Sequence, residues 1–127
     1  SYTANPLACA AGAESLRILL TEECKSSRNS ISQTFQSWQS AFSDFPMVEN
    51  VRGLGCIFAL DVKNATDTSY FNPVREKLYK LFLQKNILLR PLGNVIYVVP
   101  PYVIKEKELN YILKTIKEVL VEINLNP

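Results

Sequence analysis

The sequence predicts an α+β fold in which helices cover a small, mainly antiparallel sheet. Patterns with helical spacing occupy both ends of the chain and recur once between β-type runs, so the expected order is helix, helix, strands, helix, strands, helix. The β-type runs come in pairs interrupted by glycine, as expected for strands joined by short turns. With 127 residues, the chain suits a single domain around one core.

Two helices are predicted before the first strand. The dipeptide Asn5-Pro6 favours a helix start, because Asn caps free backbone N–H groups and Pro at the first helical position lacks only a donor that the helix does not use. Apolar residues recur at helical spacing over 7–24, and the small residues over 8–13 indicate close packing against another element. The polar run KSSRNS interrupts the pattern, and a second helix is predicted from residue 31 to an end near residues 44–46.

In the middle of the chain, the sequence pattern changes from helical to β-type. Residues 48–62, VENVRGLGCIFALDV, are typical of a strand pair or a bent strand, with Gly53 and Gly55 marking a bulge or a close approach of backbone. The following KNATDTS is a predicted surface loop. The dipeptide Asn72-Pro73 then repeats the helix-start signal, and the apolar residues after it fall on one face of a third helix.

Two further β-type runs precede the last helix. They are NILLRP (86–91) and NVIYVV (94–99), separated by a turn at Leu92-Gly93-Asn94. The two prolines that follow cannot donate ladder hydrogen bonds and therefore close the strand. A stripe of apolar residues over 109–123 predicts the closing helix.

Composition argues against several function classes. The net charge of +2 and the lack of a basic cluster disfavour nucleic acid, and no apolar run approaches the roughly 20 residues of a membrane span. Because the sequence has no His, we expect no metal site and no Cys/His nucleophile. The three cysteines indicate reduced thiols in the cytoplasm, with Cys9 in a buried apolar role. The start, SYTANPLACAAG, leads us to expect the middle of a larger protein or a processed N-terminus.

Arg90 is the residue that the core pattern leaves unexplained, because LLRPLGNVIYVVPPYVI is otherwise nearly all apolar. One interpretation is a strand-end arginine with its guanidinium in water or on a structural carboxylate. A second is an anchor for a small acid, since a planar guanidinium binds a carboxylate through two parallel hydrogen bonds. The nearly balanced charge makes a nucleic-acid contact the weakest interpretation. Composition and periodicity leave the first two open.

The neighbours of Arg90 favour the acid anchor. Pro91 biases Arg90 toward an extended backbone, and Gly93 permits a sharp reversal. Tyr97 follows on the next β-type run and offers an apolar ring with a polar tip. A stiff arginine beside a tyrosine near a strand exit suits the binding of a small acid.

Three segments resemble one enzyme family. RPLGNVIYVVPPYVI resembles the C-terminal signature of the diaminopelargonic acid (DAPA) aminotransferases, which are biotin-pathway enzymes of the class III pyridoxal-phosphate-dependent aminotransferases. SYTANPLACAA resembles the segment with which this family enters its C-terminal small domain, and VRGLGCIFALDV resembles its Arg-Gly-x-Gly strand. The resemblance implies that residues 1–127 form the C-terminal small domain of a fold type I transferase, without the large cofactor-binding domain.

The resemblance also implies roles for residues. Arg90 binds the substrate carboxylate, Tyr97 lines the same pocket, and Ser1 reaches the phosphate of pyridoxal 5'-phosphate in the neighbouring subunit of a homodimer. The implied substrates are 8-amino-7-oxononanoate and, as amino donor, S-adenosylmethionine. The Schiff-base lysine and the acid facing the pyridine nitrogen belong to the large domain, so no catalytic residue is assigned in this chain. The chain alone is therefore expected to be inactive and to bind no cofactor.

Two alternatives stay open. The chain could be a free-standing α+β binding or regulatory module whose arginine pocket senses a small carboxylate. It could also be the C-terminal domain of another class III aminotransferase, one that acts on ornithine or a γ-amino acid. The Tyr-x-x-Pro-Pro-Tyr segment that begins at Tyr97 favours the DAPA enzymes over the second alternative.

Overall fold

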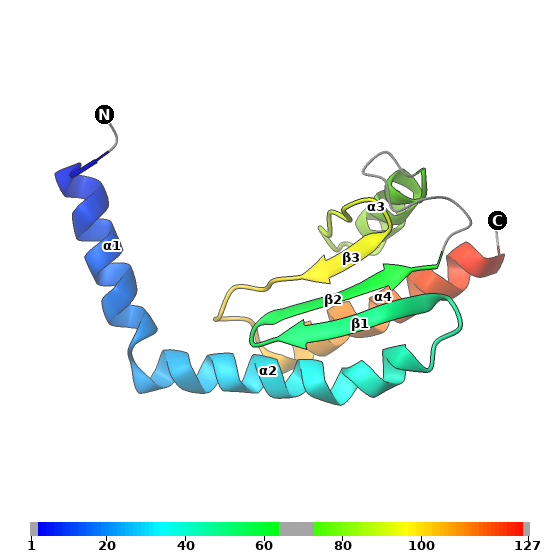
Figure 1. Ribbon diagram of the computed structural model, residues 1–127, viewed down its shortest axis with the longest axis horizontal. Coiled ribbons are helices and arrows are strands. Elements are labelled where there is room, and N and C mark those ends of the chain that lie inside the picture. The colour runs from blue at the N-terminus through cyan, green and yellow to red at the C-terminus, as the bar shows by residue number, and fades with distance from the viewer. Residues whose placement is uncertain (1–2, 64–72, 126–127) are drawn as a thin grey trace.

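The computed structural model describes residues 3–63 and 73–125. Its elements, in chain order, are α1 (Pro6–Leu19), α2 (Glu22–Ser43), β1 (Val48–Leu54), β2 (Ile57–Val62), α3 (Val74–Gln84), β3 (Val95–Val98) and α4 (Glu106–Leu125). The strands form an antiparallel sheet in the order β1-β2-β3; α2 and α4 lie along one face, and α3 lies beside the β3 edge (Figure 1). The predicted α+β class, with a small antiparallel sheet covered by helices, is confirmed.

The first two helices are separated by a short break at residues 20–21. As predicted, α1 begins after Asn5, whose Oδ1 accepts from two N–H groups of the first turn at 3.0 and 3.2 Å. Thr21 caps α2 by accepting from the N–H of Cys24 at 3.2 Å. The prediction that KSSRNS separates two helices is wrong, because these residues form the first turns of α2. Their side chains are mostly exposed, so their low hydrophobicity marks a solvated helix face and not a break.

The strand pair predicted over 48–62 is confirmed as the β1–β2 hairpin. Gly55 has a φ of +56° in its turn, a conformation that glycine adopts without strain. The bulge lies between Glu49 and Arg52, at Asn50 with a φ of +50°, and therefore not at either glycine. Around this bulge, Asn50 and Arg52 both donate to the carboxylate of Asp61, at 3.0 and 2.7 Å.

One face of the sheet forms the core. Successive strand residues point to opposite faces, and those on the helix side of β2 and β3 are each at most 2% exposed. Phe58 lies in the middle of this face, with its ring centroid 5.4 Å from Phe35 and 5.5 Å from Phe42, both of α2. The apolar stripe of α4 packs against the same cluster, which confirms the helix predicted over 109–123. The buried strand residues are Phe58, Leu60, Val62, Ile96 and Val98.

The segment before β3 is extended but is not a strand, so the strand predicted over 86–91 is wrong. Alternate side chains from Ile87 to Pro91 pack inward, whereas Leu88 and Arg90 are exposed. Within the described chain, pairing starts only at Leu92, which forms an isolated bridge with the first residue of β3. The β-type run therefore indicated extended backbone correctly, but the described part of the fold brings no partner strand alongside it.

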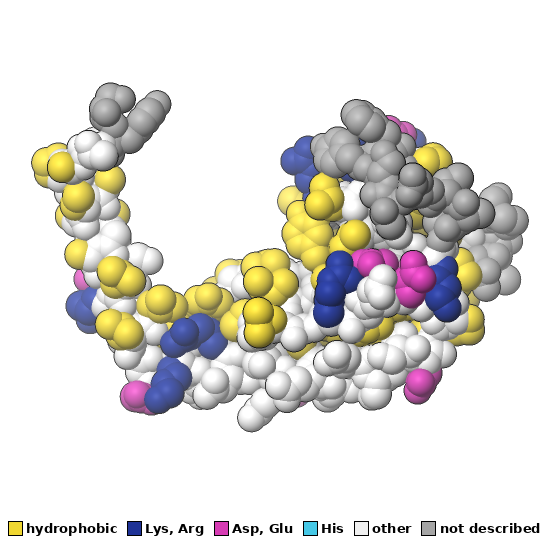
Figure 2. All heavy atoms as spheres, in the orientation of Figure 1, with side chains coloured by type: hydrophobic (Ala, Val, Ile, Leu, Met, Phe, Trp, Pro, Cys, Tyr) yellow, Lys and Arg dark blue, Asp and Glu magenta, His cyan; other side chains and the backbone are white. Residues whose placement is uncertain are grey.

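The helix α1 projects from the rest of the molecule as an arm (Figure 1). None of its residues is buried, and Leu7 is 82% exposed. Hydrophobic side chains line this arm and the hollow beside it (Figure 2). The close packing predicted for residues 8–13 is therefore not made by the part of the chain that the structure describes, and Cys9 is exposed instead of buried.

Leu78 and Leu83 offer a matched test of the core, because they lie on the same helix with exposed fractions of 0% and 44%. We expect Leu78→Ala to lower the free energy of unfolding by about 2–5 kcal/mol, since it removes buried methyl groups and leaves a cavity. Leu83→Ala should lower it by less than about 1 kcal/mol. Chemical denaturation of both variants measures the difference, and equal losses would contradict this packing.

Candidate functional site

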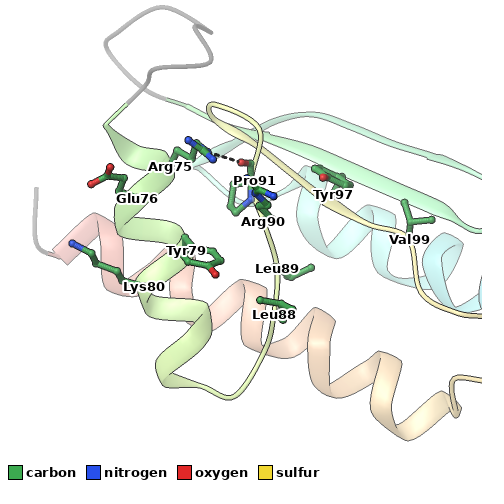
Figure 3. A pocket seen from close by; sticks show the side chains of 10 residues that line it. All are labelled: Arg75, Glu76, Tyr79, Lys80, Leu88, Leu89, Arg90, Pro91, Tyr97 and Val99. Carbon is green, nitrogen blue, oxygen red and sulfur yellow. Dashed lines mark hydrogen bonds between the residues drawn. The ribbon is translucent and has the colours of Figure 1, made fainter.

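A cleft of about 820 Å³ lies where α3, residues 88–91 and β3 meet (Figure 3). This volume is within the range of small-molecule sites, roughly 300–1,000 Å³. Both residues predicted to bind substrate, Arg90 and Tyr97, line the cleft. The other lining residues are Arg75, Glu76, Tyr79, Lys80, Leu88, Leu89, Pro91 and Val99.

Arg90 is aimed into the cleft by its backbone. Pro91 restricts Arg90 to extended conformations, and its own ring is buried, so the neighbouring arginine points outward. Within the described residues, the guanidinium of Arg90 makes no hydrogen bond and no ion pair. The structural carboxylate considered for Arg90 is therefore not found in this part of the chain.

Arg90 differs from the other arginines in its hydrogen bonding. Each of the remaining four has a hydrogen-bonded protein partner, and Arg90 is the one of the chain's five that has none among the described residues. A guanidinium left in water at the wall of a cleft is available to an anionic ligand. The pairs are Arg17 with Glu14, Arg28 with the carbonyl of Leu19, Arg52 with Asp61 and Arg75 with the carbonyl of Pro91.

Tyr97 stands on the open face of the sheet. In β3 it pairs with Ala59 of β2, while both of its chain neighbours turn toward the core. Its side chain is 41% exposed, and its hydroxyl makes no hydrogen bond within the described residues. Tyr97 therefore offers the cleft an apolar ring wall and an uncommitted hydroxyl.

Sequence reasoning missed the wall that α3 contributes. Arg75, Glu76, Tyr79 and Lys80 are spaced one helical turn apart in pairs, which places them on one side of α3. Their polar spacing is that of an ordinary solvated helix face, and the sequence carried no signal that residues 88–91 would run beside it. With Arg90 included, three cationic side chains and one carboxylate line the cleft, so its electrostatic potential favours an anion.

A second hollow of about 610 Å³ adjoins the cleft and shares Leu88, Leu89 and Val99 with it. Its other walls come from residues 86–87, residues 98–104 and the first turns of α4, and they are largely apolar apart from Asn86, Lys107 and Glu108. The two hollows together present a cationic end near Arg90 and an apolar end near Pro100. This arrangement suits an acid that carries an aliphatic chain.

The described residues do not by themselves fit pyridoxal phosphate. That cofactor needs a lysine and an acidic group at opposite sides of its ring. The lysine and the carboxylate of the cleft, Lys80 and Glu76, stand one turn apart on the same exposed side of α3. Ser1, predicted to reach the cofactor phosphate, lies outside the described residues, so this contact stays a prediction.

Other reactive groups do not assemble a second site. The cysteines are free thiols, and burial raises the pKa of the Cys56 thiol, which the nearby Arg28 offsets only in part. A raised pKa leaves less of the nucleophilic thiolate at neutral pH. Within residues 3–63 and 73–125, no group of three or more Cys, Asp or Glu residues could hold a metal ion, and no helix has the length and apolar character to cross a bilayer.

Comparison with known sequences identifies relatives of the chain. Residues 1–120 match the family model for class III aminotransferases. The chain is 35% identical over 123 residues to the adenosylmethionine-8-amino-7-oxononanoate aminotransferase of Synechococcus elongatus, an alignment that covers 97% of this chain and 28% of that protein. It is 32% identical over 126 residues to the mitochondrial gamma aminobutyrate transaminase 1 of Solanum lycopersicum, covering 96% of this chain and 24% of that protein.

Solved structures agree with these sequence matches. The crystal structure of the adenosylmethionine-8-amino-7-oxononanoate aminotransferase of Methanocaldococcus jannaschii has a TM-score of 0.83 and 28% identity, over 96% of this chain and 29% of that one. The α+β fold is thus the one found in class III transaminases, which are of fold type I, and the chain spans less than a third of the length of these relatives. The family match over residues 1–120, the sequence identities and the shared fold together assign this chain to the class III aminotransferase family.

Proposed function

We propose that residues 1–127 are the C-terminal small domain of a DAPA aminotransferase, which transfers an amino group to 8-amino-7-oxononanoate in biotin biosynthesis. The observation that carries this proposal is the guanidinium of Arg90, which has no partner among the described residues and lines an anion-favouring cleft beside Tyr97. The names of the bacterial and archaeal relatives and the RPLGNVIYVVPPYVI segment support the choice of substrate.

Arg90 holds the keto acid by its carboxylate. Two parallel hydrogen bonds from the guanidinium suit a carboxylate, and a hydrogen bond to a charged group contributes roughly 1.5–3 kcal/mol. The aliphatic chain of the acid lies along the apolar surface that the two hollows share at Leu88 and Val99, with the ring of Tyr97 beside it. An acid fixed at its carboxylate end has a defined position for its ketone, which lowers the entropic part of the barrier.

The groups that hold the cofactor come, in this proposal, from a large domain outside this chain. Pyridoxal phosphate, when bound, carries the amino group from the donor, S-adenosylmethionine, to the acceptor. Support comes from the unsuitable placement of Lys80 and Glu76 on one helix side and from the apolar side of α1, which the described residues leave exposed and which suits packing against a further domain. The complete enzyme is proposed to be a cytoplasmic homodimer in which Ser1 reaches the cofactor phosphate of the neighbouring subunit.

In the complete enzyme, Arg90→Ala should raise KM for 8-amino-7-oxononanoate about 10- to 100-fold, because the charge-assisted hydrogen bonds to the carboxylate are lost. KM for the amino donor should change little. Arg90→Lys should give an intermediate value, since an ammonium cannot form two parallel hydrogen bonds with one carboxylate. Steady-state kinetics with each substrate varied in turn measures these effects.

Lys114→Ala is the control for the loss of one positive charge, because Lys114 is exposed on α4 and does not line the cleft. It should leave both KM values unchanged. If Arg90→Ala raised both KM values equally, or neither, Arg90 would not be the carboxylate anchor.

The 127-residue chain alone should show no specific reaction with pyridoxal phosphate. We expect no absorbance band of a lysine-bound cofactor, and borohydride reduction should label lysines only weakly and at several positions, as for exposed amines. Peptide mass spectrometry locates the labels. A single, stoichiometrically labelled lysine would overturn the assignment of the cofactor lysine to another domain.

The sequence identity to a gamma aminobutyrate transaminase favours a second candidate substrate, a short ω-amino acid with its own carboxylate. An arginine anchor serves either acid, so the cleft alone does not separate them. The longer apolar surface at Leu88 and Val99 favours the longer acid. Comparison of kcat/KM for 8-amino-7-oxononanoate with that for 4-oxobutanoate, the aldehyde acid formed from γ-aminobutyrate by transamination, decides between the two.

A further inference from the structure

Few polar contacts hold the segment that carries Arg90. At one end, the N–H of Ile87 donates to the carbonyl of Phe82 at 2.9 Å, and at the other Leu92 exchanges two backbone hydrogen bonds with Val95 at 2.9 and 3.0 Å. Between these points, residues 88–91 make a single hydrogen bond within the part of the chain that the structure describes.

That single bond comes from Arg75 on α3. Its Nε donates to the carbonyl oxygen of Pro91 at 3.3 Å, across the gap between the helix and the extended segment (Figure 3). The donor stands on a firmly anchored element, because Leu78 and Phe82 of α3 are fully buried in the core. Among the described residues, a rigid helix therefore supplies the only polar tether to a segment that has no ladder hydrogen bonds there.

The tether acts one residue from the proposed anchor. The ring of Pro91 fixes its own φ and restricts Arg90 to extended conformations, so few rotations remain between the Pro91 carbonyl and Arg90, and a displacement of this carbonyl is largely transmitted to Arg90. Arg75 and Arg90 also line the same cleft with like charges, which disfavours rotamers that turn Arg90 toward α3. Both effects hold the Arg90 guanidinium toward the open part of the cleft.

We infer that Arg75 is a positioning residue for substrate binding: it fixes the carbonyl of Pro91 and thereby the orientation of the Arg90 guanidinium. This inference rests on the proposed role of Arg90. The competing arrangement is a direct contact between Arg75 and the acid, since Arg75 itself lines the cleft. The two arrangements differ in whether Arg75 still matters once Arg90 is gone.

The test is a double-mutant cycle in the complete enzyme. In the wild-type background, Arg75→Ala should raise KM for 8-amino-7-oxononanoate roughly 3- to 10-fold, the size expected for one hydrogen bond, with kcat and the donor KM unchanged. Arg75→Lys, which keeps a donor for the Pro91 carbonyl, should recover most of this loss. Lys114→Ala again serves as the control for charge.

The effect of Arg75→Ala in the Arg90→Ala background decides whether Arg75 is a positioning residue. Arg75→Ala added to Arg90→Ala should raise KM no further, because a positioning residue acts only through the group that it positions. The same fold-increase in both backgrounds would mean that Arg75 contacts the acid itself and would overturn the inference. An unchanged KM for Arg75→Ala in the wild-type background, with or without a lower unfolding midpoint, would overturn it as well.

The cycle also separates this inference from the proposed function. If Arg90→Ala alone left KM for the keto acid unchanged, the carboxylate anchor itself would be wrong, and the positioning role would be wrong with it. If Arg90→Ala raised KM and Arg75→Ala did not, the proposed function would stand and only the role of Arg75 would be wrong.

Discussion

The alternation of side chains along β2 and β3 is the constraint on which the rest of the structure depends. Because successive residues face opposite sides, burying Phe58 and Leu60 under α2 and α4 obliges Ala59 to face the other way. The same rule turns Tyr97 outward, between two buried neighbours of β3. One buried face therefore determines which face remains for a ligand, and a one-residue shift in register would exchange the core and the site.

The candidate site lies where this regular sheet ends. Past its β3 edge, the extended residues 88–91 are held by inward side chains and one helix-to-carbonyl hydrogen bond instead of a ladder. A segment without a partner strand can turn a long side chain into the space beside α3, where the guanidinium of Arg90 has no partner in residues 3–63 and 73–125. The contrast with Arg52, which is committed to Asp61 within the sheet, shows how an arginine behaves where the fold supplies a carboxylate.

The helix α1 gains none of its stability from side chains buried in the core. Its cap at Asn5 and its helical spacing make it a helix, yet none of its residues is buried in this chain. A helix whose apolar side is not buried by the described residues gains little stability from burial, so its conformation here rests on local preferences. The small fraction of the relatives' length that the chain spans agrees with the proposal that α1 packs against a further domain.

Local signals were sufficient for much of this protein. The Asn5-Pro6 helix start predicted α1, and apolar stripes predicted α3 and α4. The glycine-bearing run predicted the β1–β2 hairpin, and the arginine before Pro91 pointed to Arg90 and Tyr97 as site residues. Each of these depends on residues close together in the chain. Only the tertiary structure decided that 86–91 pairs with no strand in the described part of the chain, that α1 stands exposed, and that the polar side of α3 with Arg75 closes the cleft. Each of these features depends on whether segments distant in the sequence contact one another. The fold determines which surfaces meet, and no local pattern encodes that.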